Sequence, residues 1–178
     1  RANRSYGVSG PWRGMKLHTH EAGSRVAGIM RWPAKIKAGS KSDVAVSSLD
    51  FLPTFAEIGN GKIPEDRELD GTNFLAALDG KALEREKPLL WAYYNSYNGK
   101  RYVPTVAMRD GDMKVRATLI DTKGTSQLDA ANIEAIKAAK LGEFEIYDLS
   151  KDPRETKPRP VEGSPLPAKM EALYRSML

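Results

Sequence analysis

VPTVAMRDGDMKVRATLID, residues 103–121, contains two runs rich in β-branched residues on either side of Asp110-Gly111-Asp112. Val, Thr and Ile favour extended backbone, and an Asp-Gly pair between two such runs is a strong signal for a tight hairpin turn. The stretch therefore predicts two antiparallel strands, at 103–110 and 113–121, and the rest of the second half is expected to assemble around them.

Further elements are predicted on both sides of this hairpin. LLWAYYN (89–95) and the alternating FEIYDL (144–149) are expected strands, and Asp152-Pro153 closes the second. Ala131 to Lys140 reads as a helical segment with Ile133, Ile136 and Leu141 near one face. A Pro-rich linker (157–167) and an amphipathic helix (168–178) follow. The second half is thus predicted to be a small antiparallel sheet with a helix against it.

The first half carries a different pattern. The apolar run at 26–32 ends at Trp32-Pro33 and reads as a buried strand stopped by proline. Helices are expected at about 48–58, before Gly59-Asn60-Gly61, and at 73–78. The charged stretch GKALEREKP (80–88) ends in proline, which favours a domain boundary there.

Composition narrows the function classes. The 178 residues include no cysteine, which excludes disulfides and thiolate metal sites. No apolar run approaches the roughly 18 residues of a membrane span, so none is predicted. Residues 1–41 hold nine Lys or Arg and a single acid, Glu21. Such a basic segment is suited to an anionic substrate or to nucleic acid, although a solvated basic surface has the same composition.

The most unusual chemistry lies in SGPWRGMKLHTHEAGSRV, residues 9–26. His18 and His20 would point the same way on an extended segment, but a zinc site needs a third protein ligand. The chain has only these two histidines, and Glu21 would lie on the opposite face. We therefore predict no metal ligands here.

The same loop contains Ser9-Gly10-Pro11-Trp12-Arg13, which fits the Ser/Cys-x-Pro-x-Arg signature of type I sulfatases. In that family the first residue becomes formylglycine, the nucleophile. The longer family signature places a small residue before the Arg, a Leu three residues after it and Thr-Gly beyond, and these places hold Trp12, Lys16, His18 and Thr19. Ser9 is therefore not predicted to be the nucleophile.

A different part of the same family fits better. Its members read much like GPLRGGK, EGGIRVP and RWPGKI, and the chain has similar residues in the same order. The matching motifs are Gly10-Pro11-x-Arg13-Gly14-x-Lys16, Glu21-x-Gly23-x-Arg25-Val26, Arg31-Trp32-Pro33-x-Lys35-Ile36, Ser48-Leu49-Asp50-Phe51-Leu52-Pro53-Thr54, Pro64-x-Asp66-Arg67-x-Leu69-Asp70-Gly71, Met108-Arg109-Asp110-Gly111-Asp112-Met113-Lys114 and Phe144-Glu145-Ile146-Tyr147-Asp148-Leu149-x-x-Asp152-Pro153-x-Glu155. Nearly the whole chain is covered. It resembles the C-terminal portion of a type I sulfatase of the arylsulfatase or N-acetylgalactosamine-6-sulfatase type.

The resemblance implies an α/β fold class, as an α+β fragment. Residues 1–85 would be the end of a large alkaline-phosphatase-like α/β domain. Residues 86–178 would form a small domain with a four-stranded antiparallel sheet and a C-terminal helix. The nucleophile and the ligands of the family's calcium ion would lie outside this chain, so the fragment alone is expected to bind no cofactor and to be inactive. A periplasmic or secreted location is also implied.

The resemblance assigns roles within the loop. Lys16 corresponds to the family's sulfate-contacting lysine and is expected to be both sulfate-binding and catalytic, since a lysine is a compact charge. His18 and His20 are expected to face the substrate. Gly14, Glu21 and Arg25 are expected to support the loop. Ala22 and Ala27 replace a usual Gly and Pro, so the path after Glu21 can differ.

Two other functions remain open from the sequence. The basic segment together with exposed aromatic residues would suit a non-catalytic module that binds sulfated glycans. The aromatic residues are Trp91, Tyr93, Tyr94, Tyr97 and Tyr102. The same features would suit nucleic acid, but no nucleic-acid motif is present, so no such partner is predicted. The expected partners are a sulfated small-molecule or glycan substrate and the remainder of the chain's own sulfatase domain.

Overall fold

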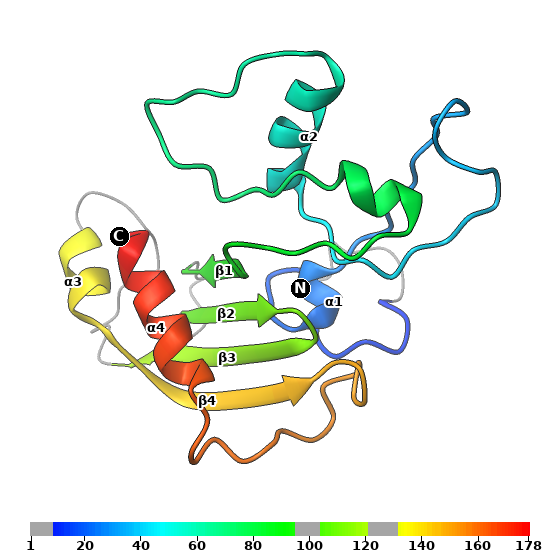
Figure 1. Cartoon of the computed structure of the whole chain (residues 1–178). Helices are drawn as coiled ribbons and strands as arrows, with labels where there is room; N and C mark the ends of the chain where they lie inside the picture. Colours follow the sequence, from blue (N-terminus) through cyan, green and yellow to red (C-terminus); the bar gives the residue numbers. More distant parts are fainter. Residues whose placement is uncertain (1–8, 95–103, 121–131) are drawn as a thin grey trace. The chain divides into compact units, whose positions relative to one another are not determined.

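The predicted hairpin forms strands β2 (Thr105–Asp110) and β3 (Met113–Ile120), seen in a computed structural model that describes residues 9–94, 104–120 and 132–178 (Figure 1). The strands pair antiparallel, with Val106 opposite Ala117 and Met108 opposite Val115. Gly111 turns the chain at φ 58°, a left-handed conformation that glycine adopts without a steric penalty. The turn is confirmed where the Asp-Gly pair predicted it.

Strands β1 (Leu89–Tyr93) and β4 (Lys140–Asp148) complete a four-stranded sheet in the order β1-β2-β3-β4. Helices α3 (Ile133–Ala138) and α4 (Leu166–Ser176) follow β3 and β4 in the chain. The predicted antiparallel sheet with a C-terminal helix is confirmed. Parts of the expected elements, at 95, 103, 121 and 131, lie outside the described residues.

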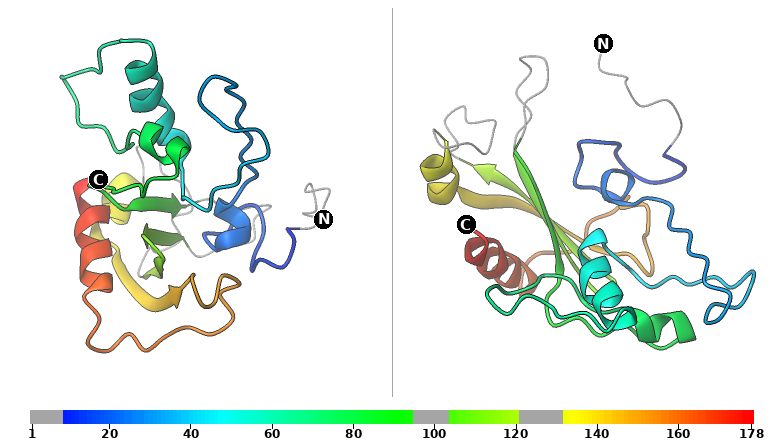
Figure 2. Two further views of the ribbon diagram at one scale, coloured as in Figure 1. Left: turned by 45° about the vertical axis from the view of Figure 1, so that its right-hand side comes forward. Right: turned by 90° about the horizontal axis from the view of Figure 1, so that it is seen from above.

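The hydrophobic core lies between one face of the sheet and the helices, and α4 crosses that face (Figures 1 and 2). Met170 and Tyr174 are one helical turn apart on α4, and both are buried. Their neighbours come from alternate positions of the strands and from the α3 segment: Val106, Met108, Val115, Ala117, Leu119, Ile136, Ala139, Leu141 and Ile146. Side chains between these positions therefore point to the opposite face of the sheet.

A bulge in β4 changes which side chains reach that opposite face. Arg116 pairs with Glu145 and Thr118 with Gly142, so β4 has one more residue than β3 over this stretch. Glu143, inside it, has φ 51°. As a result Leu141 and Ile146 both join the core although they are five residues apart.

Several details of the second half differ from the sequence prediction, among them the C-terminal helix, which spans Leu166–Ser176 rather than 168–178. Helix α3 ends at Ala138, and β4 begins at Lys140 rather than at 144, because Leu141 pairs with Leu119 and joins the core. The stretch 157–167 is not a free linker. Arg159 forms a bridge with Ile146, its amide donating to the Ile146 carbonyl at 2.7 Å.

The chain divides into two compact units, residues 1–26 with 90–178 and residues 27–89. The second unit contains a 3₁₀ turn, η1 (Ser48–Asp50), followed by helix α2 (Phe51–Ile58) and a second 3₁₀ turn, η2 (Leu75–Asp79). The two helical predictions for this unit are confirmed, the second as 3₁₀ structure. The predicted division at 85/86 concerns larger sulfatase domains and stays a prediction.

The buried strand predicted at 26–32 does not form in this structure. The segment has no strand, and Val26 and Ile29 are 86% and 94% exposed. A strand needs a neighbour for its N–H and C=O groups. Among the described residues no strand pairs with this segment.

The described residues contain no helix that is both long enough and apolar enough to span a bilayer.

Candidate functional site

The sheet face opposite α4 is polar and is covered by the loop 9–25, which includes helix α1 (Glu21–Ser24) (Figure 2). Six side chains on this face form hydrogen bonds or ion pairs with the loop or with one another: Thr105, Arg109, Lys114, Arg116, Glu145 and Tyr147. The loop that carries the predicted site residues is thus attached to a rigid sheet by hydrogen bonds and ion pairs.

Arg13 is the first attachment point of the loop. Its Nη1 donates to the Tyr147 hydroxyl at 2.7 Å and to the Glu155 carbonyl oxygen at 3.1 Å. The Tyr147 hydroxyl donates in turn to Glu145 Oε1 at 2.9 Å. Burial raises the pKa of Tyr147 to about 12, and its hydrogen bond to Glu145 acts in the same direction. Tyr147 is therefore a neutral hydroxyl that can donate to Glu145 while accepting from Arg13.

Thr19 and Glu21 form the second attachment. The Thr19 hydroxyl donates to the Thr105 hydroxyl at 3.1 Å, and both residues are buried. The backbone amide of Glu21 donates to Glu155 Oε2 at 2.7 Å. Since α1 has only four residues, these tertiary contacts rather than helix propensity hold it in place.

The carboxylate of Glu21 lies among three cations. Lys114 Nζ lies 2.9 Å from Oε1, while Arg25 Nη1 and Arg109 Nη1 lie 3.4 and 3.8 Å from Oε2. Lys114 Nζ also lies 3.1 Å from Glu155 Oε1. Burial raises the pKa of Glu155, and Lys114 opposes that shift. Glu21, Lys114 and Glu155 are almost completely buried, so the charge of Lys114 is compensated by the two carboxylates, and Arg25 and Arg109 add to the compensation of Glu21.

Lys16 lies between the two attachments, at the tip of a turn. The His18 amide donates to the Met15 carbonyl at 3.0 Å, which closes the turn around Lys16 and Leu17. Leu17 has φ 81°, the left-handed conformation required at this position of a type II turn and normally taken by glycine. Lys16 is exposed and has no hydrogen-bond or ion-pair partner among residues 9–94, 104–120 and 132–178. The structure thus presents a single cation on a strained turn.

Two glycines allow the close approach of the loop to itself. Gly14 has φ 86°, and a Cβ there would lie 3.1 to 3.2 Å from His18 and His20 atoms. A Cβ on Gly23 would lie 1.8 Å from the His18 carbonyl oxygen, which no side chain could tolerate. The turn and α1 therefore pack together only because these positions lack a side chain.

The two histidines occupy different environments, with ring centroids 6.2 Å apart. His18 is exposed at the surface of the loop, whereas His20 is buried beside the sheet. Burial lowers the pKa of His20 to about 4, and the Arg116 and Arg13 charges add to this shift. His20 is therefore neutral at pH 7, and its Nε2, 3.7 Å from Glu145 Oε2, forms no ion pair there.

Glu145 remains ionised beside His20. Burial alone would raise its pKa, but hydrogen bonds from Tyr147 and Arg116 lower it below the usual value. Arg116 Nη1 donates to Glu145 Oε2 at 2.7 Å. On the outer side of the loop, the Arg25 guanidinium lies 4.3 Å from the centroid of the Trp12 ring, a cation–π distance. Arg25, at the C-terminal end of α1, thus contacts both Glu21 at the start of this helix and Trp12 near the start of the loop.

The described residues do not gather the ligands of a metal ion. Within residues 9–94, 104–120 and 132–178 no group of three or more His, Asp or Glu side chains is placed to hold one. The carboxylates of the loop and of the sheet face beneath it, Glu21, Glu145 and Glu155, are already paired with Lys or Arg. The described residues therefore do not form a calcium site, and the resemblance implies calcium ligands in a part of the enzyme outside this chain.

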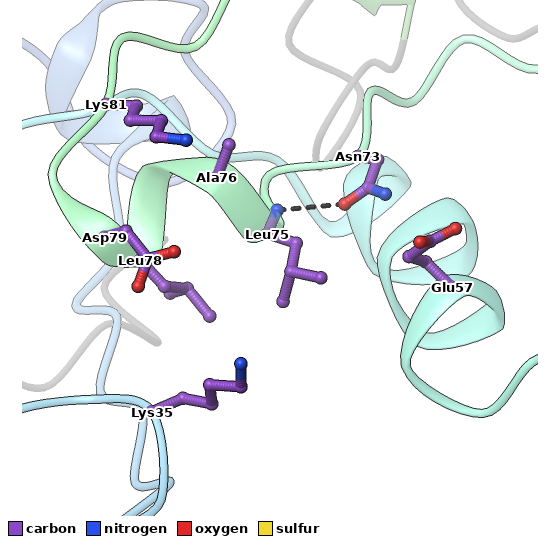
Figure 3. A pocket seen from close by; sticks show the side chains of 8 residues that line it. All are labelled: Lys35, Glu57, Asn73, Leu75, Ala76, Leu78, Asp79 and Lys81. Atoms are coloured by element: carbon purple, nitrogen blue, oxygen red, sulfur yellow. Dashed lines mark hydrogen bonds between the residues drawn. The ribbon is translucent and has the colours of Figure 1, made fainter.

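One cavity of about 370 Å³ lies in the unit 27–89 (Figure 3). Its lining combines aliphatic side chains with two lysines and two carboxylates: Lys35, Glu57, Asn73, Leu75, Ala76, Leu78, Asp79 and Lys81. Asn73 Oδ1 accepts from the Leu75 amide at 2.9 Å and so begins η2. None of the residues expected to contact sulfate or substrate lines this cavity.

The loop residues named from the sequence, Gly14, Lys16, His18, His20, Glu21 and Arg25, lie together on one attached loop. Their supports were not assigned from the sequence: Arg13, Lys114, Arg116, Glu145, Tyr147 and Glu155. The sequence contained one signal for these supports: MKVRATL alternates apolar residues with charged or polar ones over 113–119. Tyr97 and Tyr102, named for the glycan-binding alternative, lie outside the described residues.

Comparisons with known proteins agree with this reading. Residues 14–132 match the protein-family model described as N-sulphoglucosamine sulphohydrolase, C-terminal. Human steryl-sulfatase is 31% identical over 156 residues, which cover 85% of this chain and 27% of the relative. The ulvan-active sulfatase of Formosa agariphila is 33% identical over 159 residues, which cover 84% and 30%.

Solved structures show the same fold. A crystal structure of Ps i-CgsB superposes with a TM-score of 0.67 at 21% identity, covering 94% of this chain and 32% of that one. The chain thus spans less than a third of the length of each of these three proteins. The resemblance found in the sequence is confirmed. The chain belongs to the sulfatase family, in the part that its family model describes as C-terminal.

Proposed function

We propose that the protein containing this chain hydrolyses sulfate esters, and that Lys16 contacts the sulfate group. The observation that carries the proposal is the presentation of Lys16: an exposed cation on a turn whose two flanks, at Arg13 and at Thr19 to Glu21, are fixed to the sheet. Membership of the sulfatase family supports the reaction class.

The chemistry needs a cation that is held in place before the reaction. Negative charge grows on the leaving oxygen as the S–O bond breaks, so a fixed positive group stabilises the transition state more than the ground state. A lysine ammonium can approach one or two oxygens as a compact charge. Holding the turn at both sides removes the reorganisation that a mobile lysine would require.

Other parts of the reaction are assigned outside this chain. We place the nucleophile and the calcium ion in the rest of the protein, and we assign no step of the reaction to calcium. Ser9 is proposed to remain an unmodified serine. Because the nucleophile is proposed to lie outside this chain, the 178-residue chain by itself should be inactive. The proposed location of the enzyme is the periplasm or the outside of the cell.

The proposed substrate is a sulfated small molecule or glycan. The two relatives are named a steryl-sulfatase and an ulvan-active sulfatase, so family membership alone leaves the alcohol undefined. His18 is proposed to face the substrate, since it is exposed two residues after Lys16. His20 is proposed to act nearby as a neutral ring, because burial keeps its pKa at about 4.

A glycan-binding module without catalysis has less support. Among the described aromatics, the Trp91 ring centroid lies 5.9 Å from Lys114 Nζ, and the Tyr94 hydroxyl donates to the Tyr174 hydroxyl at 2.9 Å. These two side chains are thus used within the fold. The contact of Tyr94 is with the core helix α4.

The remainder of the sulfatase domain is the proposed partner of the unit 27–89. Helix α2 exposes large apolar side chains: Phe51, Leu52, Phe55 and Ile58. Leu52 and Phe55 are 52% and 61% exposed. An apolar face of this kind is unusual on a surface in contact with water and marks an interface. Because the chain spans less than a third of its relatives, we propose that this face contacts the part of the enzyme outside this chain. We also propose that residues 1–85 are the end of the large sulfatase domain and that residues 86–178 form the small one.

The test is turnover of the whole enzyme with Lys16→Ala, measured on para-nitrophenyl sulfate and, by sulfate release, on sulfated glycans. Removing one preorganised partner of this kind typically lowers kcat by about 100- to 1000-fold. The melting temperature should change little because Lys16 is exposed. Lys16→Arg should restore only part of the activity, since a planar guanidinium places its charge differently. A Lys16→Ala enzyme with kcat within a few-fold of the parent would contradict the proposal.

A further inference from the structure

Lys114 stands out as a fully buried lysine on a central strand, β3, that the proposed reaction does not use. Lysine is almost never fully buried unless it is paired, because the ammonium loses its hydration. Here Nζ lies 2.9 Å from Glu21 Oε1 and 3.1 Å from Glu155 Oε1. The two carboxylates provide the compensation.

The three ionic residues come from three separate parts of the chain. Glu21 begins α1 on the loop, Lys114 lies on β3, and Glu155 follows β4. Each belongs to a different sequence motif of the family resemblance, and none of those motifs by itself predicts the contact. Lys114 therefore joins the loop to the sheet and to the segment after it.

Glu155 extends this connection to the other side of the Lys16 turn. Its Oε2 accepts from the Glu21 amide at 2.7 Å, and its carbonyl oxygen accepts from Arg13 Nη1 at 3.1 Å. Arg13 precedes Lys16 by three residues, and Glu21 follows it by five. One residue thus contacts both flanks of the turn, and Lys114 balances its charge.

We propose that Lys114 is a positioning residue for the sulfatase reaction: by bridging Glu21 and Glu155 beneath the loop, it sets the position of Lys16. This role rests on the proposed contact of Lys16 with sulfate. Lys114 lies beneath the loop, on the sheet, so its effect on the reaction passes through the loop.

Loss of the lysine charge would leave Glu21 and Glu155 facing each other without their shared cation. Two buried carboxylates repel each other, and the remaining cations, Arg25 and Arg109, are more distant from Glu21 than Lys114 is, at 3.4 and 3.8 Å from Oε2. The loop is the part best able to move, because α1 is only one turn long. A displacement of about 1 Å at a catalytic group can lower a rate about 100-fold.

The experiment is a double-mutant cycle on the whole enzyme, with kcat and KM for para-nitrophenyl sulfate measured in the parent, Lys16→Ala, Lys114→Met and the double variant. We expect Lys114→Met to lower kcat about 10- to 100-fold and to change KM much less. In the Lys16→Ala background the same substitution should lower kcat by less than about threefold, because the residue it positions is absent.

Lys169→Met is the matched control. Lys169 also forms an ion pair, with Asp110, but it lies on α4 and is half exposed. Its loss should leave kcat within about twofold of the parent. A general effect of removing an ion-paired lysine would instead lower kcat in both variants, which would contradict a role specific to Lys114.

A milder variant covers the case in which Lys114→Met does not fold. Glu21→Gln keeps the shape of the side chain and the backbone hydrogen bond to Glu155, while it removes the charge that faces Lys114. Glu21→Gln should lower kcat of the parent enzyme by about 3- to 30-fold. In the Lys16→Ala background it should leave kcat nearly unchanged.

The outcomes separate the two proposals. A Lys16→Ala enzyme with parental kcat contradicts the proposed function and, with it, the route through Lys16. A strongly impaired Lys16→Ala enzyme together with parental kcat in Lys114→Met or Glu21→Gln would overturn only the positioning role. The same conclusion would follow if either substitution lowered kcat by the same factor in the Lys16→Ala background as in the parent.

Discussion

The backbone amide of Glu21 donates to the carboxylate of Glu155 at 2.7 Å, across 134 residues of sequence. This bond connects the loop that carries Lys16 with the segment after the last strand of the sheet. Side-chain carboxylates that accept from a buried amide restrict the backbone as well as the side chain. The position of the loop in this family member therefore depends on residues at the far end of the chain.

Gly23 is predicted to be essential for the compact form of the loop. In Gly23→Ala the new Cβ would meet the His18 carbonyl oxygen at 1.8 Å and the Met15 carbonyl oxygen at 2.7 Å, so the backbone on both sides of the Lys16 turn must shift. We expect the free energy of unfolding of the chain to fall by about 1–3 kcal/mol, measured by chemical denaturation.

Gly28→Ala is the control for this change. Its Cβ would meet nothing within 4 Å, and its backbone is not left-handed. The expected change in stability is within about 1 kcal/mol, in either direction. Equal losses in the two variants would show that the close contact at Gly23 has no special importance.

The sequence predicted those elements whose signals are local. The hairpin at 105–120 follows from Asp110-Gly111 and the flanking β-branched residues, and α4 follows from its apolar spacing. The bulge at Glu143 gave no such signal, yet it places Glu145 and Tyr147 on the face that holds the loop.

The contacts of the site could not be derived in the same way. The alternation in 113–119 shows that Lys114 and Val115 point to opposite faces, but it does not show that both faces are buried. Burial of Lys114 depends on Glu21, 93 residues earlier in the chain. The absence of the strand predicted at 26–32 has the same cause, because strand pairing depends on a partner that the segment itself does not specify.

His20 is predicted to make stability depend on pH. Burial, Arg116 and Arg13 lower its pKa to about 4, against 6.5 in the unfolded chain, while Glu145 acts in the opposite direction. Between these values the unfolded chain binds a proton and the folded chain does not, so stability falls as the pH is lowered from 6.5 towards 4. The loss assigned to His20 between pH 7 and pH 5 is about 2 kcal/mol.

The measurement compares urea denaturation of the parent and His20→Gln at pH 7 and pH 5. His20→Gln should lose less stability than the parent over this interval, because the side chain no longer titrates. His18→Gln is the comparison: His18 is exposed, so its substitution should change the pH dependence of stability less than His20→Gln does. Identical pH dependence in the parent and His20→Gln would rule out the assignment to His20.

The exposed face of α2 is predicted to behave as an interface. Leu52→Lys with Phe55→Lys should reduce binding of the dye ANS to the 178-residue chain and leave its melting temperature nearly unchanged, because both side chains are mostly exposed. In the whole protein the same pair should lower the melting temperature clearly, since two charges would be buried. Glu57→Lys, an exposed position on the same helix, should have little effect on dye binding. An unchanged melting temperature of the whole protein would show that this face stays exposed.

Asp50 is predicted to be the main polar support of the unit 27–89. It is fully buried, and its Oδ1 accepts from Arg85 Nη1 at 2.9 Å and from the Thr72 amide at 2.8 Å. Its Oδ2 accepts from the Ser47 amide at 2.6 Å and also pairs with Arg85. One carboxylate thus begins η1 and holds two later segments of the unit against it.

Asp50→Asn should therefore lower the free energy of unfolding of this unit by about 3 kcal/mol. The change removes the carboxylate that compensates the mostly buried Arg85 guanidinium, which would keep only the Ala45 carbonyl as a partner among the described residues, and it places an amide donor where Asp50 accepted hydrogen bonds. Asp79→Asn, at an exposed position, should change it by less than about 0.5 kcal/mol. Both are measured by chemical denaturation at pH 7.

The pH dependence gives an independent check on Asp50. Burial alone would raise its pKa, but hydrogen bonds from Arg85, Ser47 and Thr72 hold the pKa below its usual value. The folded chain thus releases this proton more readily than the unfolded chain. Asp50 therefore contributes stability above its unfolded pKa and loses that contribution as the pH falls through the lower folded pKa. The difference in stability between the parent and Asp50→Asn should be largest near neutral pH and shrink in acid, whereas a constant difference would mean that the charge of Asp50 contributes nothing.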